Sequence, residues 1–406
     1  MLFRIIKKIT TYFFFLVFFP FKHFIPKGNI VVLGTSTRHQ YRDNTKYLLE
    51  YFAHKNKFKV FWITDNDEVK SYLDNQGIET IGLKSPLKMI WVLLRAKVIV
   101  DSGTEYFNPF GLTSSNKTIK LTTLHGNGPK ATFSRFHPPD NEEIAIQQIR
   151  SYYSFDYINY PSDYSMVSVG RRCHLLPNKK IVSLGYPRCD QYFDDDYINK
   201  RYSSKMVAKK ICASYSEKDK IIYYTPTWRP YKYEFPLTSM PGLNMIDFNK
   251  WLRDRNYFFF YSVHSAHFPI DKPIGLERII YIDSVKHPFF DVNEFMLEVD
   301  ILLNDYSTTS TEFAILNRPQ IFFMPDYDNY EVEKGFVENY KKLLVGREIA
   351  SFNEFLQAID DIETDISGYM ESYNKKRVEL LDKYYDLKDG TSCEKHYQFI
   401  SKLILD

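Results

Sequence analysis

The 406-residue sequence is poor in cysteine and in net charge, and each shortage excludes a class of protein. Its four cysteines form no CxxC pair, which argues against a zinc site or a disulfide framework and fits a reducing compartment. The formal net charge of +3 is too small to indicate a partner nucleic acid. No GxxxxGK phosphate-binding loop is present. With 44% hydrophobic residues, the chain is instead predicted to form two globular domains.

The N-terminal stretch lacks a hydrophobic run long enough to cross a membrane. Between Lys8 and Lys22 lie thirteen uncharged residues, which as a helix would span about 20 Å of a hydrocarbon core about 30 Å thick. Pro20 would also interrupt that helix. We therefore expect residues 1–27 to be a basic, aromatic segment that lies in the interface of an anionic cytoplasmic leaflet. The alternatives are a signal peptide, although no small-residue cleavage site follows, and an element buried in the core.

Short apolar stretches alternate with amphipathic ones from Asn29 onward, which predicts parallel sheets with helices on both faces. The expected strands lie within 29–35, 58–64, 97–103, 118–126, 155–162, 179–187, 220–228, 257–265, 300–305 and 319–326. The expected helices lie within 44–56, 86–96, 244–254, 292–299 and 309–318. The pattern is typical of an α/β protein with two doubly wound, Rossmann-type domains that face each other across a cleft.

The polar stretch 190–204 shows no periodicity and is predicted to be the linker between the two domains, 28–200 and 201–406. Its "FDDDY" at 193–197 has the aspartate spacing of a DxD metal motif. Because no strand precedes it, we interpret it as a solvated run of charge.

Polar residues follow several of the expected strands at their carboxyl ends. His125 follows one strand, Thr227 and Arg229 follow a second, His264 a third and Asp305 a fourth. Doubly wound sheets bind ligands at these ends, so we expect these residues to share a ligand-binding site.

Five consecutive hydroxyl residues, Ser307 to Thr311, open a predicted helix, which is more than an N-cap needs. Hydroxyl groups and free backbone N–H groups at a helix start favour a phosphate, so we predict a phosphate cradle here. Asp305 would repel phosphate and is expected to accept hydrogen bonds from a ribose or an acceptor hydroxyl, or to cap the helix. Glu312 either faces the same site or is a first-turn acid favoured by the helix dipole.

In "LTTLHGNGPK", a histidine, two glycines and a lysine come directly after a strand. The glycines allow the backbone to approach a substrate, His125 can accept a proton near neutral pH, and Lys130 can neutralise a phosphate. Arg229 of "PTWRP" suits a phosphate or, alternatively, a surface ion pair. In "VHSAH", strand alternation makes only one of His264 and His267 the site residue.

Several of these stretches together resemble one known family. "LHGNGPK", "LGYPRCDQYF", "YYTPTWRP", "VHSAH", "DILLNDYSTTSTEFAILNRPQIFF" and "DYDNYEVEKGFVENY" occur in the order found in CDP-glycerol glycerophosphotransferases of teichoic-acid and capsule synthesis. "DNTKYLLEYF" and "DGTSCEKHYQFI" fit as well, so the resemblance covers about Gly34 to Ile400. It implies a GT-B fold, with an acceptor-side N-terminal domain and a C-terminal domain that binds the CDP donor. It also implies a peripheral enzyme of the cytoplasmic membrane face.

The resemblance carries over to individual residues. The catalytic histidine and the lysine of the family's HGxxxK motif match His125 and Lys130, and the histidine of its second domain best matches His264. The family's D-Y-S-S motif matches Asp305, Tyr306, Ser307 and Thr308. Four departures are the shifted proline in "HGNGPK", Ser265 in place of a proline, Thr308 in place of the second serine of D-Y-S-S, and Glu312 in place of an aspartate. They leave the donor polyol and the acceptor open.

The implied reaction is attack of an acceptor hydroxyl on the β-phosphorus of CDP-glycerol, with CMP as leaving group. His125 would act as base. His264, Arg229 and the Ser307–Thr309 cradle would stabilise charge without a metal or other cofactor. The donor-binding residues are Thr227, Arg229, Asp305, Ser307, Thr308, Thr309 and Glu312, while Gly126 and Lys130 would contact phosphate or acceptor. The expected partners are a CDP-polyol, a lipid-linked saccharide or polymer, and an anionic membrane surface.

Three alternatives remain open from the sequence. A CDP-ribitol-dependent transferase differs only in its donor. A GT-B glycosyltransferase would release a nucleoside diphosphate instead of CMP. A non-catalytic scaffold of a capsule complex would leave the polar residues at the strand ends without a purpose.

Overall fold

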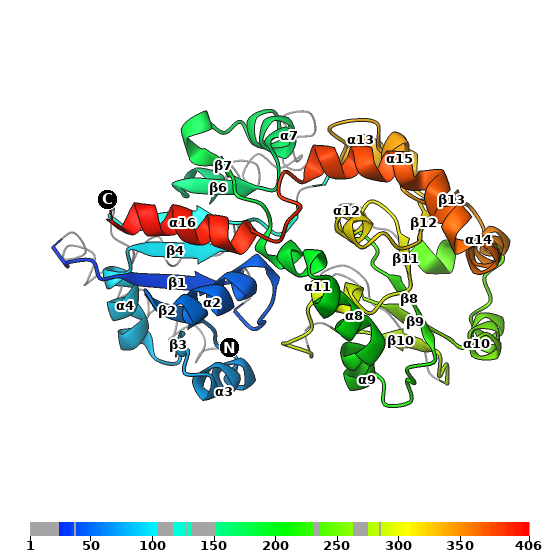
Figure 1. Cartoon of the computed structure of the whole chain (residues 1–406), viewed down its shortest axis with the longest axis horizontal. Coiled ribbons are helices and arrows are strands. Elements are labelled where there is room, and N and C mark those ends of the chain that lie inside the picture. Colours follow the sequence, from blue (N-terminus) through cyan, green and yellow to red (C-terminus); the bar gives the residue numbers. More distant parts are fainter. Residues whose placement is uncertain are drawn as a thin grey trace, which may run out of the picture. The chain divides into compact units, whose positions relative to one another are not determined.

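The computed structural model describes residues 24–35, 38–103, 117–126, 128–131, 151–229, 236–262, 275–283 and 286–405. The chain forms two compact units (Figure 1). In the described ranges, the first unit runs to His125, resumes at 151–190 and includes the C-terminal residues from 389 onward. The second unit contains 126–131 and 191–388.

The first unit is built on a sheet of seven parallel strands in the order β3-β2-β1-β4-β5-β6-β7. Its strands are β1 (Ile30–Gly34), β2 (Lys59–Ile63), β3 (Glu79–Ile81), β4 (Val98–Asp101), β5 (Ile119–Thr122), β6 (Tyr157–Tyr160) and β7 (Ile181–Ser183). Its helices are α2 (Asp43–Lys55), α3 (Asp67–Asn75), α4 (Pro86–Arg95), α7 (Asp163–Ser165), the π-helical η2 (Met166–Arg171), the 3-10 helix η3 (Asn178–Lys180) and α16 (Ser392–Leu405). The 3-10 helix η4 (Pro187–Phe193) leads into the second unit.

The core of the first unit lies between the sheet, α2 and α16. Leu48, Leu49 and Phe52 are spaced so that they share one face of α2, and all three are buried with Trp62 of β2. The apolar face of α16 joins the same cluster through Ile400. Burying such side chains stabilises the unit by about 1.5–3 kcal/mol each.

The second unit is built on a sheet of six parallel strands in the order β10-β9-β8-β11-β12-β13. Its strands are β8 (Lys220–Tyr224), β9 (Tyr257–Tyr261), β10 (Ile279–Tyr281), β11 (Ile301–Asn304), β12 (Gln320–Phe323) and β13 (Arg347–Ile349). Its helices are α8 (Asp195–Ser204), α9 (Met206–Ile211), α10 (Met245–Asp254), α11 (Val292–Met296), α12 (Thr309–Phe313), α13 (Tyr327–Glu333), α14 (Phe352–Thr364) and α15 (Ile366–Tyr384), with the 3-10 helices η5 (Pro236–Ser239), η6 (Ala314–Leu316) and η7 (Tyr340–Leu343).

The central strands of the second unit are buried along their whole length, as expected for a parallel sheet covered on both faces. One face packs against α10 and α14, where the rings of Phe248, Phe259 and Phe352 meet edge to face. The prediction of parallel, doubly wound sheets is therefore confirmed in both units. The sequence analysis had not indicated the three-residue strands β3, β10 and β13, or helix α3.

The chain passes from one unit to the other at residues 190–191, at the start of the predicted linker. Residues 190–193 of that stretch belong to η4 and residues 195–204 form α8, whose start is capped by the Asp194 carboxylate, which accepts the N–H of Tyr197 at 2.9 Å. The aspartates of "FDDDY" therefore start a helix, where negative charge is favoured by the helix dipole. All three aspartates are exposed, which confirms the expected solvated run of charge, but the helix itself was not predicted.

The C-terminal helix, α16, belongs to the first unit. The sequence analysis had placed it in the second domain, 201–406. The Asp190 carboxylate accepts the N–H groups of Ser392 and Cys393 at 2.9 and 2.7 Å and so caps the start of α16. The helix then packs on α2, with Phe52 and Tyr397 in edge contact at 5.1 Å between ring centroids. This packing against the first sheet decides which unit the helix joins.

The predicted membrane-associating segment falls mostly outside the described residues, which begin at Phe24. Lys27 belongs to the first unit, since its Nζ donates to Leu94 O at 2.7 Å and to Thr118 Oγ1 at 2.5 Å. In the part of the chain that the structure describes, no helix is both long enough and apolar enough to cross a membrane.

Candidate functional site

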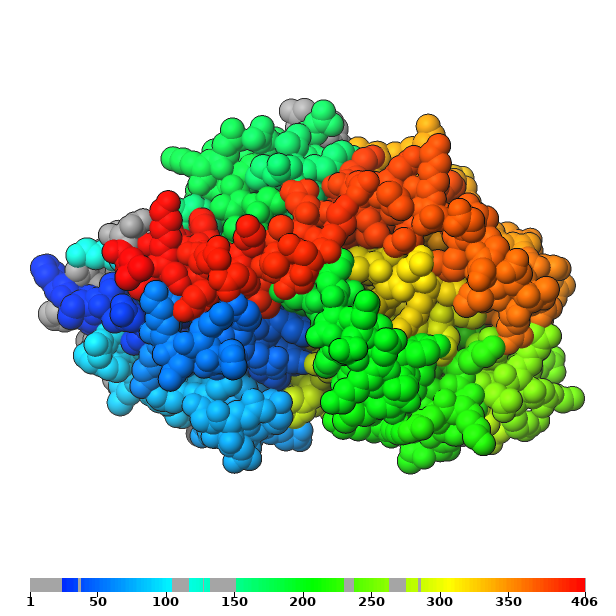
Figure 2. Space-filling model, in the orientation of Figure 1, coloured from blue at the N-terminus to red at the C-terminus, as the bar shows by residue number. Residues whose placement is uncertain are grey.

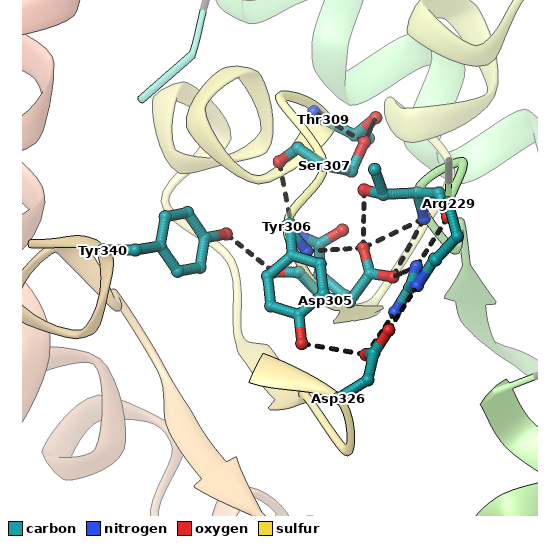
Figure 3. A network of polar contacts seen from close by, with 9 residues as sticks. Arg229, Asp305, Tyr306, Ser307, Thr309, Asp326 and Tyr340 are labelled. Atoms are coloured by element: carbon teal, nitrogen blue, oxygen red, sulfur yellow. Dashed lines mark hydrogen bonds and ion pairs between the residues drawn. The ribbon is translucent and has the colours of Figure 1, made fainter. Parts of the chain in front are cut away.

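The polar residues of the second unit gather at the carboxyl ends of β8, β11 and β12. Asp305 directly follows β11, Thr227 lies three residues after β8, and Asp326 lies three residues after β12. The three strands are neighbours in the sheet, so their carboxyl ends meet at one edge. Figure 3 shows the network of contacts that these residues form with Arg229, Tyr306 and Tyr340.

Asp305 is fully buried, and its carboxylate is held by groups from the β8 loop. Its oxygens accept the Thr227 N–H at 2.9 and 3.0 Å and the Thr227 hydroxyl at 2.7 Å, and they form an ion pair with Arg229. The hydroxyl of Tyr340 donates to the Asp305 carbonyl oxygen at 2.6 Å. A carboxylate bound in this way organises the loops around it.

Arg229 is 1% exposed and lies between two carboxylates. Besides the pair with Asp305, its Nε and Nη2 donate to the two oxygens of Asp326 at 2.9 Å each. Tyr306 donates to Asp326 at 3.0 Å, and its ring lies 5.0 Å from the guanidinium carbon. Because desolvation of a charge is costly, so many partners are what allow Arg229 to be buried.

The five consecutive hydroxyl residues divide into two groups. Ser307, Thr308 and Thr309 stay partly exposed, and the hydroxyls of Ser307 and Thr309 lie 2.9 Å apart. Ser310 and Thr311 are buried, and Thr311 donates to the Thr308 carbonyl at 2.8 Å. The predicted cradle therefore has three hydroxyls on its open side, while the other two support the start of α12.

The stretch that follows His125 packs directly on this cradle, within the second unit. A Cβ atom on Gly126 would lie 2.8 Å from Thr308 Oγ1, and one on Gly128 would lie 2.7 Å from Thr308 Cγ2. Both distances are shorter than real Cβ contacts. The glycines were predicted to let the backbone approach a substrate, and the structure shows that they let it approach Thr308.

The same stretch is held on its other side by the chain after α13. Ala131 N donates to Gly335 O at 3.0 Å and Val337 N donates to Pro129 O at 2.8 Å, around an antiparallel bridge of Lys130 with Phe336. The Phe336 ring stacks on Tyr340 at 4.7 Å between centroids. Two distant parts of the sequence thus hold residues 128–131 beside the hydroxyl cradle.

Lys130 is half-buried and interacts electrostatically with the charged residues of the same network. Burial is the main cause that lowers its pKa to about 8; the charge of Asp305 opposes this shift, and the positive charges of Arg229 and Lys334 contribute to it. Counting these groups with Asp326, three cations accompany two carboxylates. This excess of positive charge favours an anionic ligand.

His125 is placed by the first unit. Its carbonyl oxygen accepts a hydrogen bond from Arg188 Nη2 at 3.0 Å, and Arg188 Nη1 in turn pairs with Asp43 at 2.6 Å. The His125 side chain is exposed. The backbone of this histidine is therefore anchored while its imidazole faces outward.

The predicted site residues are thus brought together only in part. Thr227, Arg229 and Asp305 form one buried network. Glu312 is also buried, and its carboxylate accepts a hydrogen bond from Asn293 Nδ2 at 2.5 Å. The polar groups of these four residues already bond within the protein, and their predicted contact with the donor stays a prediction. Gly126 contacts Thr308 of the hydroxyl cradle, and Lys130 interacts electrostatically with Asp305 and Arg229. His264 and His267 are outside the described residues.

Sequence reasoning missed Asp326 and Tyr340 in the second unit, and Asp43, Asn44 and Arg188 in the first. Each lies in a stretch that carried the family resemblance. The signal was therefore present, but nothing in a single sequence shows which distant stretches make contact. In the described ranges, no group of three or more His, Cys, Asp or Glu side chains is placed to hold a metal ion.

Two buried polar atoms at this sheet edge have no hydrogen-bond partner among the described residues, Asn304 Oδ1 and Thr225 Oγ1. Buried polar atoms usually have partners, so these two atoms are exceptions at the carboxyl ends of β8 and β11.

The two-unit α/β fold is that of the wall teichoic acid polymerase TagF. A solved structure of that polymerase is similar with a TM-score of 0.70 at 20% identity, covering 92% of this chain and 89% of that one. A structure of TagF soaked with CDPG gives a TM-score of 0.73 at 19% identity, with 92% and 88% coverage.

The sequence matches the model of the CDP-glycerol:poly(glycerophosphate) glycerophosphotransferase family over residues 17–402. The chain belongs to this family and is an enzyme of the transferase class. It is 26% identical to the teichoic acid glycerol-phosphate transferase of Staphylococcus aureus, covering 93% of this chain and 94% of that one. It is 23% identical to the teichoic acid glycerol-phosphate primase of Bacillus subtilis, with 89% and 90% coverage. Ribitol-phosphate polymerases are also among its relatives.

Proposed function

We propose that this enzyme transfers glycerol phosphate from CDP-glycerol to a hydroxyl of a lipid-linked acceptor in teichoic-acid or capsular polymer synthesis, and releases CMP. One observation carries the proposal. Gly126 and Gly128 pack on Thr308, so the residues directly after His125 lie against the middle residue of the Ser307–Thr309 cradle. A base and a phosphate cradle are thereby joined through a single stretch of backbone.

In the proposed reaction, the acceptor oxygen attacks the β-phosphorus of the donor, which bears the glycerol. A new P–O bond forms as the bond from that phosphorus to the bridging oxygen breaks, and the bridging oxygen leaves as part of CMP. His125 accepts the proton of the attacking hydroxyl. The Ser307–Thr309 hydroxyls and Lys130 bind the two phosphates and stabilise the charge that develops on them.

The buried network gives this cradle its shape. Arg229 joins the loop after β8 to Asp305 after β11 and to Asp326 after β12. We assign it a positioning role, together with Thr227 and Asp305. The basic groups are proposed to replace a metal ion, so activity should persist in EDTA. Loss of activity in EDTA, restored by added Mg²⁺, would overturn this part of the proposal.

The donor polyol is tested directly by activity. The purified enzyme is incubated with a lipid-linked acceptor and either CDP-glycerol or CDP-ribitol, and CMP release is followed. We expect turnover with CDP-glycerol and a His125→Ala enzyme that is slower by about 10²–10⁴-fold with nearly unchanged donor affinity. Near-normal turnover of His125→Ala would overturn the role of the base. Turnover with CDP-ribitol alone would support the alternative of a ribitol-phosphate transferase.

Peripheral attachment to the cytoplasmic membrane face is part of the same proposal. The basic, aromatic residues 1–23 lead into the first unit at Phe24, which is 84% exposed. The first described residues lie beside the end of α4, where Gly28 N donates to Arg95 O at 2.9 Å. On the exposed side of that helix, Trp91 is 55% exposed and the Arg95 guanidinium lies over its ring. Aromatic and cationic groups of this kind suit the headgroup region of an anionic leaflet.

A further inference from the structure

The backbone that leads from β5 to His125 adopts a conformation that side chains rarely permit. Leu124 has a φ of 56°, in the left-handed region that mainly glycine and asparagine visit. Its N–H is bound by Thr122 Oγ1 at 3.1 Å, and its carbonyl oxygen accepts a hydrogen bond from Asn44 Nδ2 at 3.0 Å. The chain is thus turned sharply just before the histidine and is held there from both sides.

The next carbonyl group, that of His125 itself, is held by Arg188. Arg188 lies in η4, is 5% exposed and donates Nη2 to His125 O at 3.0 Å. Its other terminal nitrogen pairs with Asp43 at 2.6 Å, while its backbone N–H donates to Asn44 Oδ1 at 3.2 Å. Asp43 and Asn44 open α2, so a helix start and a 3-10 turn meet at the backbone of the histidine.

We propose that Arg188, oriented by Asp43, is a positioning residue for the transfer reaction and acts through His125. This inference rests on the proposed role of His125 as base. The ion pair directs the planar guanidinium so that one N–H points at the His125 carbonyl oxygen. With both carbonyls at 124 and 125 held, the direction in which the exposed imidazole leaves the backbone is set before substrate binds.

The expected effect follows from geometry. A base displaced by about 1 Å can lose about 10²-fold in rate, whereas a donor bound to the phosphate cradle does not depend on the histidine ring. Arg188→Ala should therefore lower kcat by about 10-fold to 10²-fold and leave the KM for CDP-glycerol within about twofold. Added guanidinium should restore part of the lost kcat, because it can occupy the space between Asp43 and the carbonyl oxygen.

A structural role alone would give a different result, and Arg318 provides the matched control. Its guanidinium also donates to backbone carbonyls, those of Leu297 and Val299, at 2.8 Å each. Arg318→Ala should lower the melting temperature as Arg188→Ala does but leave kcat per folded enzyme unchanged. If both variants lose activity only in proportion to their unfolded fraction, and guanidinium restores neither, the positioning role of Arg188 is overturned.

The double variant separates this inference from the proposed function. In a His125→Ala background, Arg188→Ala should change the residual rate by less than about twofold, since the group it positions is gone. An equal further loss in that background would show that Arg188 acts elsewhere and would overturn the inference while His125 remains the base. Full activity of His125→Ala alone would overturn the proposed base itself, and the inference with it.

Discussion

Gly128 lies so close to Thr308 that a Cβ atom on the glycine would be 2.7 Å from the threonine Cγ2. The contact joins the stretch after His125 to the hydroxyl cradle, and it involves a methyl group of one residue and the bare backbone of the other. Both sides of such a contact can be altered separately.

Gly128→Ala should therefore weaken activity by pushing residues 128–131 away from the cradle, and Thr308→Ser should restore much of it because serine lacks Cγ2. The measurement is kcat/KM for CDP-glycerol in the two single variants and the double variant. If the double variant is as impaired as Gly128→Ala alone, the steric contact is not what the glycine is needed for.

Replacing Arg229 by Met should destabilise the second unit strongly. The change leaves Asp305 and Asp326 buried without their cation, and breaking a buried pair in this way costs about 3–5 kcal/mol. The free energy of unfolding in urea measures it. Arg255→Met removes an exposed partner of Asp360 and is the control, with an expected loss of at most about 1 kcal/mol. Similar losses for both arginines would contradict the assigned role of the buried network.

Ser307→Ala and Thr309→Ala should each weaken binding of CDP-glycerol and of CMP by about 0.5–3 kcal/mol, because each removes a hydrogen bond to a charged phosphate. Isothermal titration calorimetry gives both affinities. The neighbouring Ser310 is buried, so Ser310→Ala is expected to leave CMP affinity unchanged. Unaltered CMP binding in a Ser307→Ala, Thr309→Ala double variant would place the phosphate elsewhere.

Donor affinity should fall as the pH rises through about 8, the lowered pKa of Lys130. Below that pH the lysine is an ammonium group that attracts the diphosphate, and above it the group is neutral. The diphosphate diester of CDP-glycerol keeps its charge over this range, so its dissociation constant from pH 6 to 10 reports on the protein. Lys130→Met should bind weakly and without this pH dependence. A wild-type constant that is flat across the range would mean that Lys130 does not contact the phosphates.

The lowered pKa of Lys130 also affects the stability of the protein, which changes with pH in the opposite direction to donor affinity. Between about 8 and the ordinary value of 10.5, the unfolded chain binds a proton at this lysine that the folded protein does not. Stability therefore gains from this group as the pH rises through that interval. Comparing urea unfolding of the wild type with that of Lys130→Met at pH 7.5 and 10 isolates the contribution, because the variant lacks it at both values.

Deleting residues 1–23 should leave a folded enzyme that no longer sediments with anionic vesicles. The deletion removes Arg4, Lys7, Lys8 and Lys22, each contributing about 1 kcal/mol near an anionic surface, but keeps Lys27 on the first unit. Use of a membrane-embedded acceptor should fall more than use of a soluble analogue. The intact chain should be released by high salt. A truncated protein that sediments fully, or an intact chain that resists both salt and alkaline carbonate, would count against peripheral attachment through this segment.

The sequence by itself determined the α/β class, the parallel sheets and the strand ends that carry polar residues, because burial on both faces and helical periodicity are local patterns. It also carried the motifs of the family. The roles of the five hydroxyl residues 307–311 could be predicted only in part. Their sequence does not distinguish them, and only the packing shows that Ser310 and Thr311 are buried.

Only the tertiary structure decided which polar residues serve the fold. The packing of β8, β11 and β12 side by side brings the charges of Asp305 and Arg229 together and buries them. The return of α16 to the first unit and the contact of Arg188 with His125 join residues far apart along the chain. Such pairings depend on strand order and on the exclusion of water from the packed interior, and neither is encoded in any short stretch of sequence.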